Sequence, residues 1–143
     1  KRLPPPGPLE HNAATLGNHS HFPVNLPQQL APPDDPLSYF MPWLIHELTH
    51  VWQYQQTGWI YMLRALSAQF RYGAEAYNFG GEANLIERRQ AGWTITRFNP
   101  EQQGEIARTY YDRQRHDNTQ DEPKKENPLS AFRPYINDIQ ELA

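Results

Sequence analysis

The chain has 143 residues, which suits one domain of about 100–200 residues. Its 16 acidic and 13 basic side chains give a net charge of −3, which argues against a general nucleic-acid-binding protein with a basic patch. The absence of cysteine excludes disulfide bonds, thiolate metal sites and a cysteine nucleophile. No apolar run approaches the roughly 20 residues of a membrane-spanning helix. The first residues, KRLPPPGP, have no apolar stretch behind them and do not predict a secretory signal.

Proline is concentrated at the start of the chain, since nine of the 14 prolines lie within residues 1–36. Because proline lacks an amide donor and fixes φ, this stretch predicts linker and irregular coil. We therefore expect a Pro-rich linker over residues 1–13 and a single domain over residues 14–143. Within the Pro-rich stretch, residues 14–23 form an island that predicts a short edge strand, with Thr15, Leu16 and Phe22 as strand-forming residues and Pro23 as its stop.

Apolar residues at three- and four-residue steps predict a long helix that begins near Ser38. Pro42 suits the first turn of this helix and Gly58 suits its end. A second helix is predicted over residues 60–72, followed by Gly73 as its stop. On this second helix, Met62, Leu63, Leu66 and Phe70 lie on one side.

The next segment gives mixed signals. Residues 76–79 are compatible with an extended segment and residues 80–81 with a turn, whereas residues 82–90 are compatible with a helix. Residues 93–96 contain strand-forming side chains. These assignments rest on short windows.

Asn99, Pro100 and Glu101 form a good helix start, with a capping residue, proline in the first position and an acid in the first turn. This helix is predicted to end near Gln114.

Residues 115–127 are polar throughout and predict a loop, and residues 130–142 predict a last helix that is broken near Pro134. The whole pattern predicts an α+β domain that is mainly helical, with a small, short-stranded sheet.

The most informative motif is the HExxH sequence HELTH, residues 46–50, inside the first long helix. With 3.6 residues per turn, His46 and His50 differ by about 40° around the helix, so both imidazoles can reach one ion. Glu47 lies about 60° from His50, so its carboxylate can lean over the same edge without binding the ion. Two neutral nitrogen ligands beside a carboxylate base are typical of a hydrolytic zinc site.

Random placement of the histidines and glutamates of this chain would produce the HExxH pattern only about 0.02 times. The alternatives are a structural role for both histidines, packed neutrally or in a closed metal site, and an inactive copy of a catalytic site. A closed zinc site normally takes four protein ligands, which here would all have to be histidines or carboxylates. We expect two further histidines, His19 and His21, to be a surface pair.

A catalytic zinc generally has three protein ligands and one open position. Gln56 stands where an extended motif would place a third histidine, so we expect a carboxylate. Glu101 opens a helix that can lie beside the motif helix, and Glu105 follows one turn later, where it can also orient a ligand histidine. Acids in a first helical turn are also common because of the helix dipole. The other acidic candidates are Glu75, Glu82, Glu87 and Asp112.

The segments HELTHVWQ, AYNF at residues 76–79 and FNPEQQGEI at residues 98–106 together resemble a known family. They are similar to the metallopeptidase domain attached to VgrG spike proteins of bacterial type VI secretion systems and to Vgr-related proteins, over about residues 14–115. The resemblance implies a zincin-like fold and Glu101 as the third zinc ligand. Residues 80–93 look like an insertion that brings Glu82 and Glu87, and Gly104 weakens its helix by roughly 1 kcal/mol relative to alanine.

The predicted function is a zinc-dependent metallopeptidase, with His46, His50 and Glu101 holding Zn²⁺ and Glu47 as the general base. Two alternatives remain: a zinc-dependent cell-wall amidase, and a catalytically silent, metal-stabilised spike-tip or adaptor domain. The candidates for stabilising an oxyanion are Tyr110, Tyr111 and His116. Trp59 and Tyr61 suit core packing better than a substrate groove.

The resemblance also implies partners and a location. It implies an antibacterial toxin that a secretion spike or other delivery protein carries through the N-terminal linker and that acts in the periplasm of the target cell. The expected partners are a peptide or protein substrate, which can be associated with the cell wall, and an immunity protein. Neither nucleic acid nor a membrane span is expected.

Overall fold

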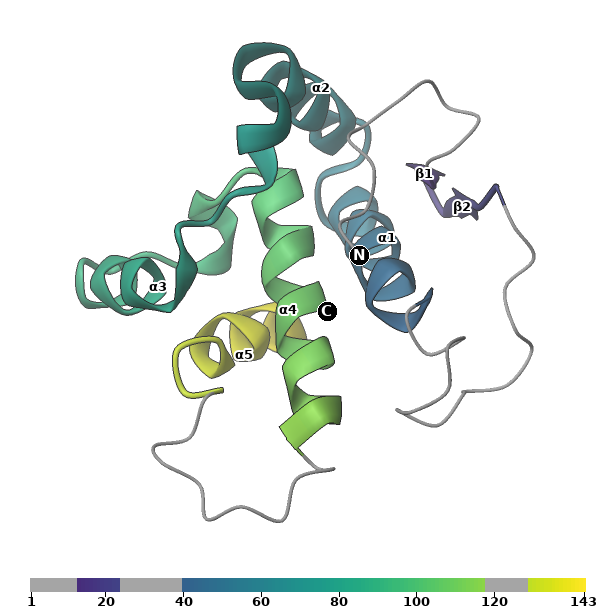
Figure 1. Cartoon of the computed structure of the whole chain (residues 1–143). Coiled ribbons are helices and arrows are strands. Elements are labelled where there is room, and N and C mark those ends of the chain that lie inside the picture. Colours follow the sequence, from purple (N-terminus) through teal and green to yellow (C-terminus); the bar gives the residue numbers. More distant parts are fainter. Residues whose placement is uncertain (1–12, 24–39, 118–128) are drawn as a thin grey trace.

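The computed structural model describes residues 13–23, 40–117 and 129–143, which form a mainly helical α+β structure (Figure 1). This confirms the predicted fold class. The predicted linker lies almost wholly outside the described residues, and the division into linker and domain stays a prediction. The described elements are β1 (Ala14–Leu16), β2 (His19–His21), α1 (Phe40–Thr57), α2 (Ile60–Tyr72), the 3₁₀ helix η2 (Gly73–Tyr77), α3 (Gly81–Gln90), the 3₁₀ helix η3 (Ile95–Arg97), α4 (Pro100–Asp117) and α5 (Arg133–Leu142).

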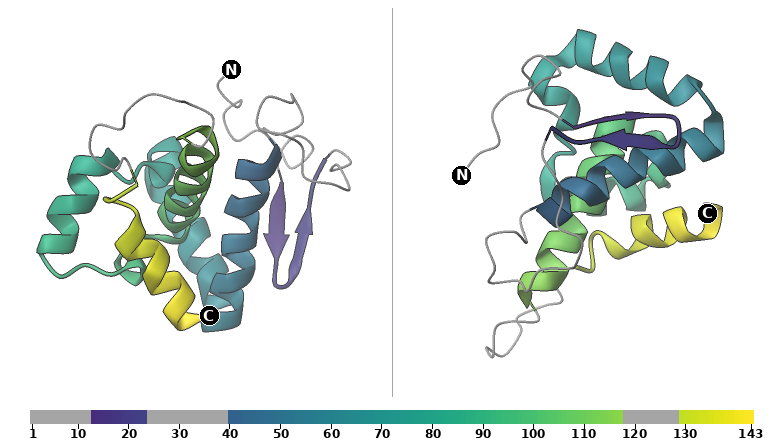
Figure 2. Two further views of the ribbon diagram at one scale, coloured as in Figure 1. Left: turned by 90° about the horizontal axis from the view of Figure 1, so that it is seen from below. Right: turned by 90° about the vertical axis from the view of Figure 1, so that its right-hand side faces the viewer.

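Helix α1 lies between the β1–β2 hairpin and α4 (Figures 1 and 2). The two strands are antiparallel, with Thr15 opposite Ser20, and the turn between them uses Gly17 at a φ of +62°. Helices α1 and α4 pack along each other more extensively than any other pair of described elements. The motif helix therefore has one side toward a hairpin and another toward a long helix that carries acids.

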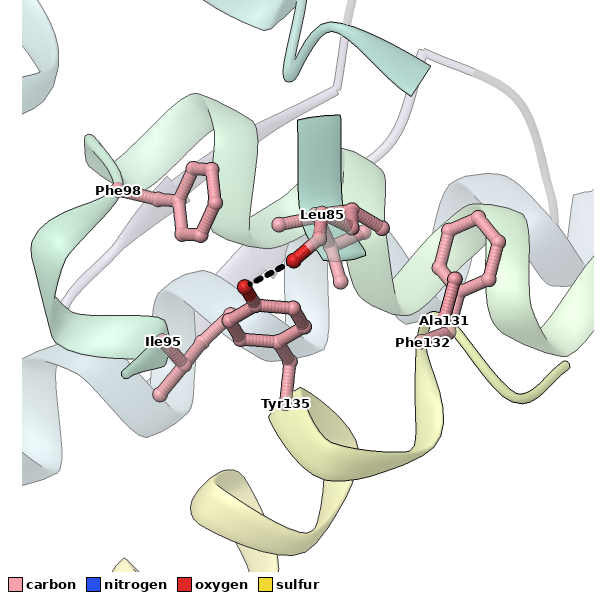
Figure 3. Close-up of a cluster of buried hydrophobic side chains, with 7 residues drawn as sticks. Leu85, Ile95, Phe98, Ala131, Phe132 and Tyr135 are labelled. Carbon is pink, nitrogen blue, oxygen red and sulfur yellow. Dashed lines mark hydrogen bonds between the residues drawn. The ribbon is translucent and has the colours of Figure 1, made fainter. Parts of the chain in front are cut away.

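The main hydrophobic cluster joins α3, η3, α4 and α5, and Trp52 of α1 packs against it (Figure 3). Ile106 of α4 is fully buried in this cluster, while Glu101 and Glu105 of the same helix face α1. Tyr135 of α5 donates a hydrogen bond of 2.7 Å to the carbonyl oxygen of Leu85 in α3. The cluster consists of Leu85, Ile95, Phe98, Ile106, Ala131, Phe132 and Tyr135.

The first two helices form where the periodicity predicts them. Helix α1 contains Pro42 in its first turn and is followed by Gly58 at a φ of +61°, and α2 has the predicted bounds. The predicted start near Ser38 lies outside the described residues. Helix α3 also matches the predicted helix, beginning one residue earlier at Gly81.

Several local predictions are wrong. The segments that are compatible with extended structure lie half in 3₁₀ helices, with residues 76–77 in η2 and residues 95–96 in η3, because short windows do not separate the two conformations. The expected edge strand is a hairpin, since Gly17 and the next residue turn the chain. Pro134 does not break the last helix but lies in its first turn, where a missing amide donor costs nothing. Helix α4 continues to Asp117, and the rest of the predicted loop lies outside the described residues.

No helix in the described ranges combines the length and apolar character needed to cross a bilayer.

Candidate metal centre

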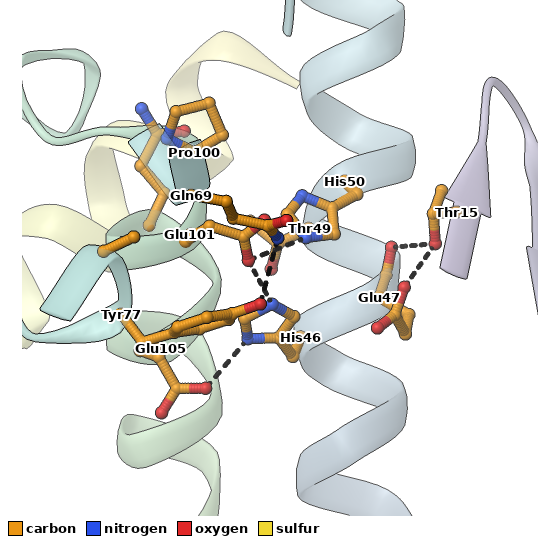
Figure 4. Close-up of polar contacts among 12 residues, drawn as sticks. Thr15, His46, Glu47, Thr49, His50, Gln69, Tyr77, Pro100, Glu101 and Glu105 are labelled. Atoms are coloured by element: carbon orange, nitrogen blue, oxygen red, sulfur yellow. Dashed lines mark hydrogen bonds and ion pairs between the residues drawn. The ribbon is translucent and has the colours of Figure 1, made fainter. Parts of the chain in front are cut away.

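Helices α1 and α4 bring His46, His50 and Glu101 together in a buried group that could hold a metal ion (Figure 4). One ligand atom from each residue lies within 4.8 Å of the others. The three residues are only 4–7% exposed. Because the helices run in opposite directions, His46 faces Glu101 and Glu105, and His50 faces Glu101.

The distances in this group fit a tetrahedral metal ion. Glu101 Oε2 lies 3.2 Å from His46 Nε2 and 3.5 Å from His50 Nε2. Two ligand atoms bound at about 2.0–2.2 Å in tetrahedral geometry are roughly 3.3–3.5 Å apart. Two imidazoles and one carboxylate suit zinc, and the same donors also bind other divalent ions.

A hydrogen-bond chain through Gln53 sets the tautomer of His50. The side-chain amide of Gln53 donates from Nε2 to the carbonyl oxygen of Pro100 and to Gln103 Oε1, both at 2.9 Å. Gln53 Oε1 must therefore be the acceptor in its 2.8 Å contact with His50 Nδ1. The proton of neutral His50 is then on Nδ1, and its Nε2 lone pair is directed to the metal position.

His46 lies between two carboxylates. Its Nε2 faces Glu101, and its Nδ1 lies 3.0 Å from Glu105 Oε1. Burial lowers the pKa of His46, but the hydrogen bonds and charges of Glu101 and Glu105 outweigh it and raise the pKa to about 9. In the metal-free protein a proton on His46 thus compensates the buried acids. Glu105 occupies the place that suits an orienting contact to a ligand histidine.

Glu101 presents one oxygen to the histidines and has the other held by a hydrogen bond. Gln69 of α2 donates from Nε2 to Glu101 Oε1 at 2.9 Å and contacts the Tyr77 hydroxyl at 3.0 Å. Burial raises the pKa of Glu101, but His46 and His50 outweigh it and lower the pKa to about 2. The carboxylate is therefore charged and fixed in orientation, as a metal ligand must be.

Glu47 does not belong to the metal-binding group. Its carboxylate is turned to the hairpin, where Thr15 Oγ1 donates to Glu47 Oε2 at 2.7 Å (Figure 4). Tyr61 strengthens the same junction by donating from its hydroxyl to the Thr15 carbonyl oxygen at 2.8 Å. Glu47 thus links α1 to β1, and its role as a general base stays a prediction.

The other acidic candidates lie elsewhere in the described part of the chain, and none joins the metal-binding group. Glu82 pairs with Arg113, and Glu75 accepts a hydrogen bond from Asn78. Glu87 and Asp112 are likewise outside the group.

Among the oxyanion candidates, Tyr110 packs against the hydrophobic cluster, and the Tyr111 hydroxyl accepts a hydrogen bond from Arg115. The side chain of His116 lies outside the described residues. Tyr61 is buried as predicted, whereas Trp59 is 57% exposed instead of packed in the core. His19 and His21 are both exposed on β2.

Sequence reasoning missed the polar residues that support the ligands. Gln53 is three residues beyond His50 and so faces the same side of α1, a spacing that could have indicated it. Gln69, Tyr77 and Thr15 come from other elements, and no local pattern connects them with the motif.

No family model, no curated protein and no solved structure matches this chain.

Proposed function

We propose that the protein is a zinc-dependent metallopeptidase. The observation that carries the proposal is the buried group of His46, His50 and Glu101, with distances that fit one tetrahedral ion. Three protein ligands leave one position for water or substrate, as in catalytic zinc sites. The orienting contacts of His50 to Gln53 and of His46 to Glu105 support a metal-binding role for both rings.

We assign the proton transfer to Glu47, the neighbour of His46 in the HELTH motif. Zinc, when bound, supplies Lewis-acid polarisation of a carbonyl group and acidifies water. Glu47 accepts the proton of the attacking water and later delivers it to the leaving amine. The hydrogen bond from Thr15 holds Oε2, while Oε1 has no hydrogen-bond partner among the described residues and is the atom that we assign to the proton.

Two variants test the proposal together. Glu47→Gln preserves an oxygen for Thr15 and should keep zinc and the thermal midpoint but lose at least a hundredfold of chelator-sensitive cleavage of unfolded polypeptide. Glu101→Gln should lose zinc, with Glu82→Gln as a matched control that keeps it. Undiminished cleavage by Glu47→Gln would reject the general base, and normal zinc content in Glu101→Gln would reject the ligand.

Burial of the site favours a second candidate, a catalytically silent domain that metal stabilises. His46, His50, Glu101 and Glu47 are each less than a tenth exposed, which limits access for a polypeptide. This candidate predicts that zinc raises the thermal midpoint but that neither unfolded polypeptide nor isolated cell wall is cleaved. Cleavage of either one that Glu47→Gln abolishes would reject it.

The substrate and biological setting are proposed from the sequence resemblance alone. We propose a type VI secretion effector that acts in the periplasm of a rival bacterium, with an amidase acting on cell-wall peptide as the alternative chemistry. Incubation with unfolded polypeptide and with isolated cell wall separates these reactions. Periplasmic expression that is equally harmless for the wild type and Glu47→Gln would count against a toxin.

A further inference from the structure

The outer face of α2, together with its capping residue Trp59, exposes a narrow stripe of large apolar side chains. Trp59, Leu63, Leu66 and Phe70 recur at four- and three-residue steps, which places them within an arc of about 60° around the helix. Each is more than half exposed, and Phe70 is 96% exposed. We call these four residues the α2 stripe. Scattered apolar residues on a surface need no explanation, but a continuous row of this kind indicates a contact surface.

The packing of α2 fixes the stripe in its outward position. The opposite face of the helix buries Tyr61, Ala65 and Ala68 against the rest of the protein. Tyr61 also bonds to the hairpin, and Gln69 bonds to Glu101. Rotation of the helix to cover the stripe would break these contacts. The α2 helix lies at one end of the described structure in Figure 1 and in the right-hand view of Figure 2. The exposed fractions of the four side chains show that the stripe faces solvent.

Positive charge lies on the flank of α2, in a groove that the stripe borders at Leu63. Arg64, Arg71 and Arg97 line one groove with a volume of about 470 Å³, between α2 and the start of α4. The groove lining includes Ile60 and Leu63 but no acidic residue, and α2 itself contains no Asp or Glu. Within the described ranges, no carboxylate forms an ion pair with these three arginines. The local charge is thus opposite to the net charge of −3 of the chain.

We infer that the α2 stripe and the arginine groove bind the surface of an anionic phospholipid membrane. An amphipathic helix with Trp, Phe and Leu on one face and Arg beside them lies in the interface, with its apolar face about 5–10 Å deep. The guanidinium groups of Arg64, Arg71 and Arg97 bind lipid phosphates, for which their planar donors are suited. This contact requires no membrane-spanning helix and does not depend on the metal centre.

The combined geometry favours a lipid surface over a protein partner. The stripe lies on the exposed outer face of α2, at one end of the described structure, and a deformable bilayer can receive it without a complementary groove. With the stripe inserted, the long arginine side chains of the adjoining groove can reach phosphate headgroups. The contact is therefore sensitive to lipid charge and to salt.

The test is co-sedimentation of the full chain with vesicles. Vesicles of phosphatidylglycerol and phosphatidylcholine in equal parts should bind the protein at least tenfold more tightly than phosphatidylcholine alone. Raising the salt concentration to 0.5 M should abolish most of this preference, because exposed charges are then screened. Insertion of the stripe should shift the tryptophan emission to the blue, since Trp59 leaves water.

Paired variants separate the two parts of the surface. Leu66→Ser with Phe70→Ser should remove the emission shift and at least tenfold of the binding, whereas Ile86→Ser, on the exposed face of α3, should not. Arg64→Glu with Arg71→Glu should remove the preference for phosphatidylglycerol, whereas Arg133→Glu should keep it. All variants are first shown to retain the wild-type thermal midpoint and zinc content.

Three results would overturn the inference. The first is an absence of binding to either vesicle, and the second is binding that the α2 variants leave unchanged. The third is a stable dimer in solution that Phe70→Ser dissociates, because the stripe would then be covered by a second copy of the chain.

Discussion

Gly104 of α4 lies directly against the imidazole of His46 on α1. A Cβ atom built on Gly104 would be 2.7 Å from His46 Cε1 and 2.8 Å from His46 Nδ1, closer than real side chains approach. Glycine in the middle of a helix costs about 1 kcal/mol relative to alanine. The close approach of α1 and α4 explains why glycine is present despite this cost. A larger residue would push the His46 ring away from the position of a bound metal.

Gly104→Ala should therefore weaken zinc binding by at least tenfold, even though alanine favours the helix. His46 cannot easily yield, because Glu101 and Glu105 contact its two ring nitrogens. Competition with a fluorescent chelator measures the affinity, and Gln114→Ala on the exposed side of α4 is the matched control. If zinc affinity is unchanged and the thermal midpoint rises, the His46 ring and the added methyl group fit side by side, and the prediction is wrong.

Gln53→Ala should lower zinc affinity by about 10–100-fold, the usual effect of removing an orienting partner of a ligand histidine. The substitution leaves His50 Nδ1 without its acceptor, and the carbonyl oxygen of Pro100 loses a donor. Isothermal titration calorimetry with zinc measures the effect. Gln55→Ala, on the exposed side of the same helix, should bind as the wild type does. Equal affinity for both variants would contradict the proposed orienting role.

Zinc binding should release about one proton near pH 7, because the pKa of His46 is raised to about 9 and the metal needs the Nε2 lone pair. Since protonated His46 competes with the metal, zinc affinity should rise with pH until about pH 9 and then level off. Calorimetry in buffers of different ionisation enthalpy counts the released protons. Zinc uptake at pH 7 without proton release would show that His46 carries no extra proton in the metal-free protein.

Tyr135→Phe should destabilise the fold by about 1–2 kcal/mol without changing zinc affinity. The substitution removes the buried hydrogen bond to Leu85 and leaves that carbonyl oxygen without its donor. Urea denaturation of the metal-free protein measures the free energy of unfolding. Ile136→Val, at a half-buried position on the same helix, controls for a general loss of packing. If Tyr135→Phe also lowers zinc affinity, the hydrophobic cluster and the metal centre are coupled, and the prediction is wrong.

The sequence by itself determined the features that depend on helix geometry. Three- and four-residue periodicity predicted α1 and α2, and the HELTH spacing placed His46 and His50 one turn apart on one face. The start signal at Asn99 predicted the helix that carries Glu101. Each prediction succeeded because the interactions responsible lie within a few residues along the chain.

Only the tertiary structure decided which side chains meet across helices. The antiparallel packing of α1 on α4 brings Glu101, and not Glu82, to the two histidines. The same packing explains why residue 104 is glycine, and it lets Gln53 orient the ring of His50. The hairpin turns Glu47 to Thr15, and the burial of one face of α2 leaves Phe70 outside. These relationships depend on contacts between residues that are far apart in sequence, which local propensity and spacing do not encode.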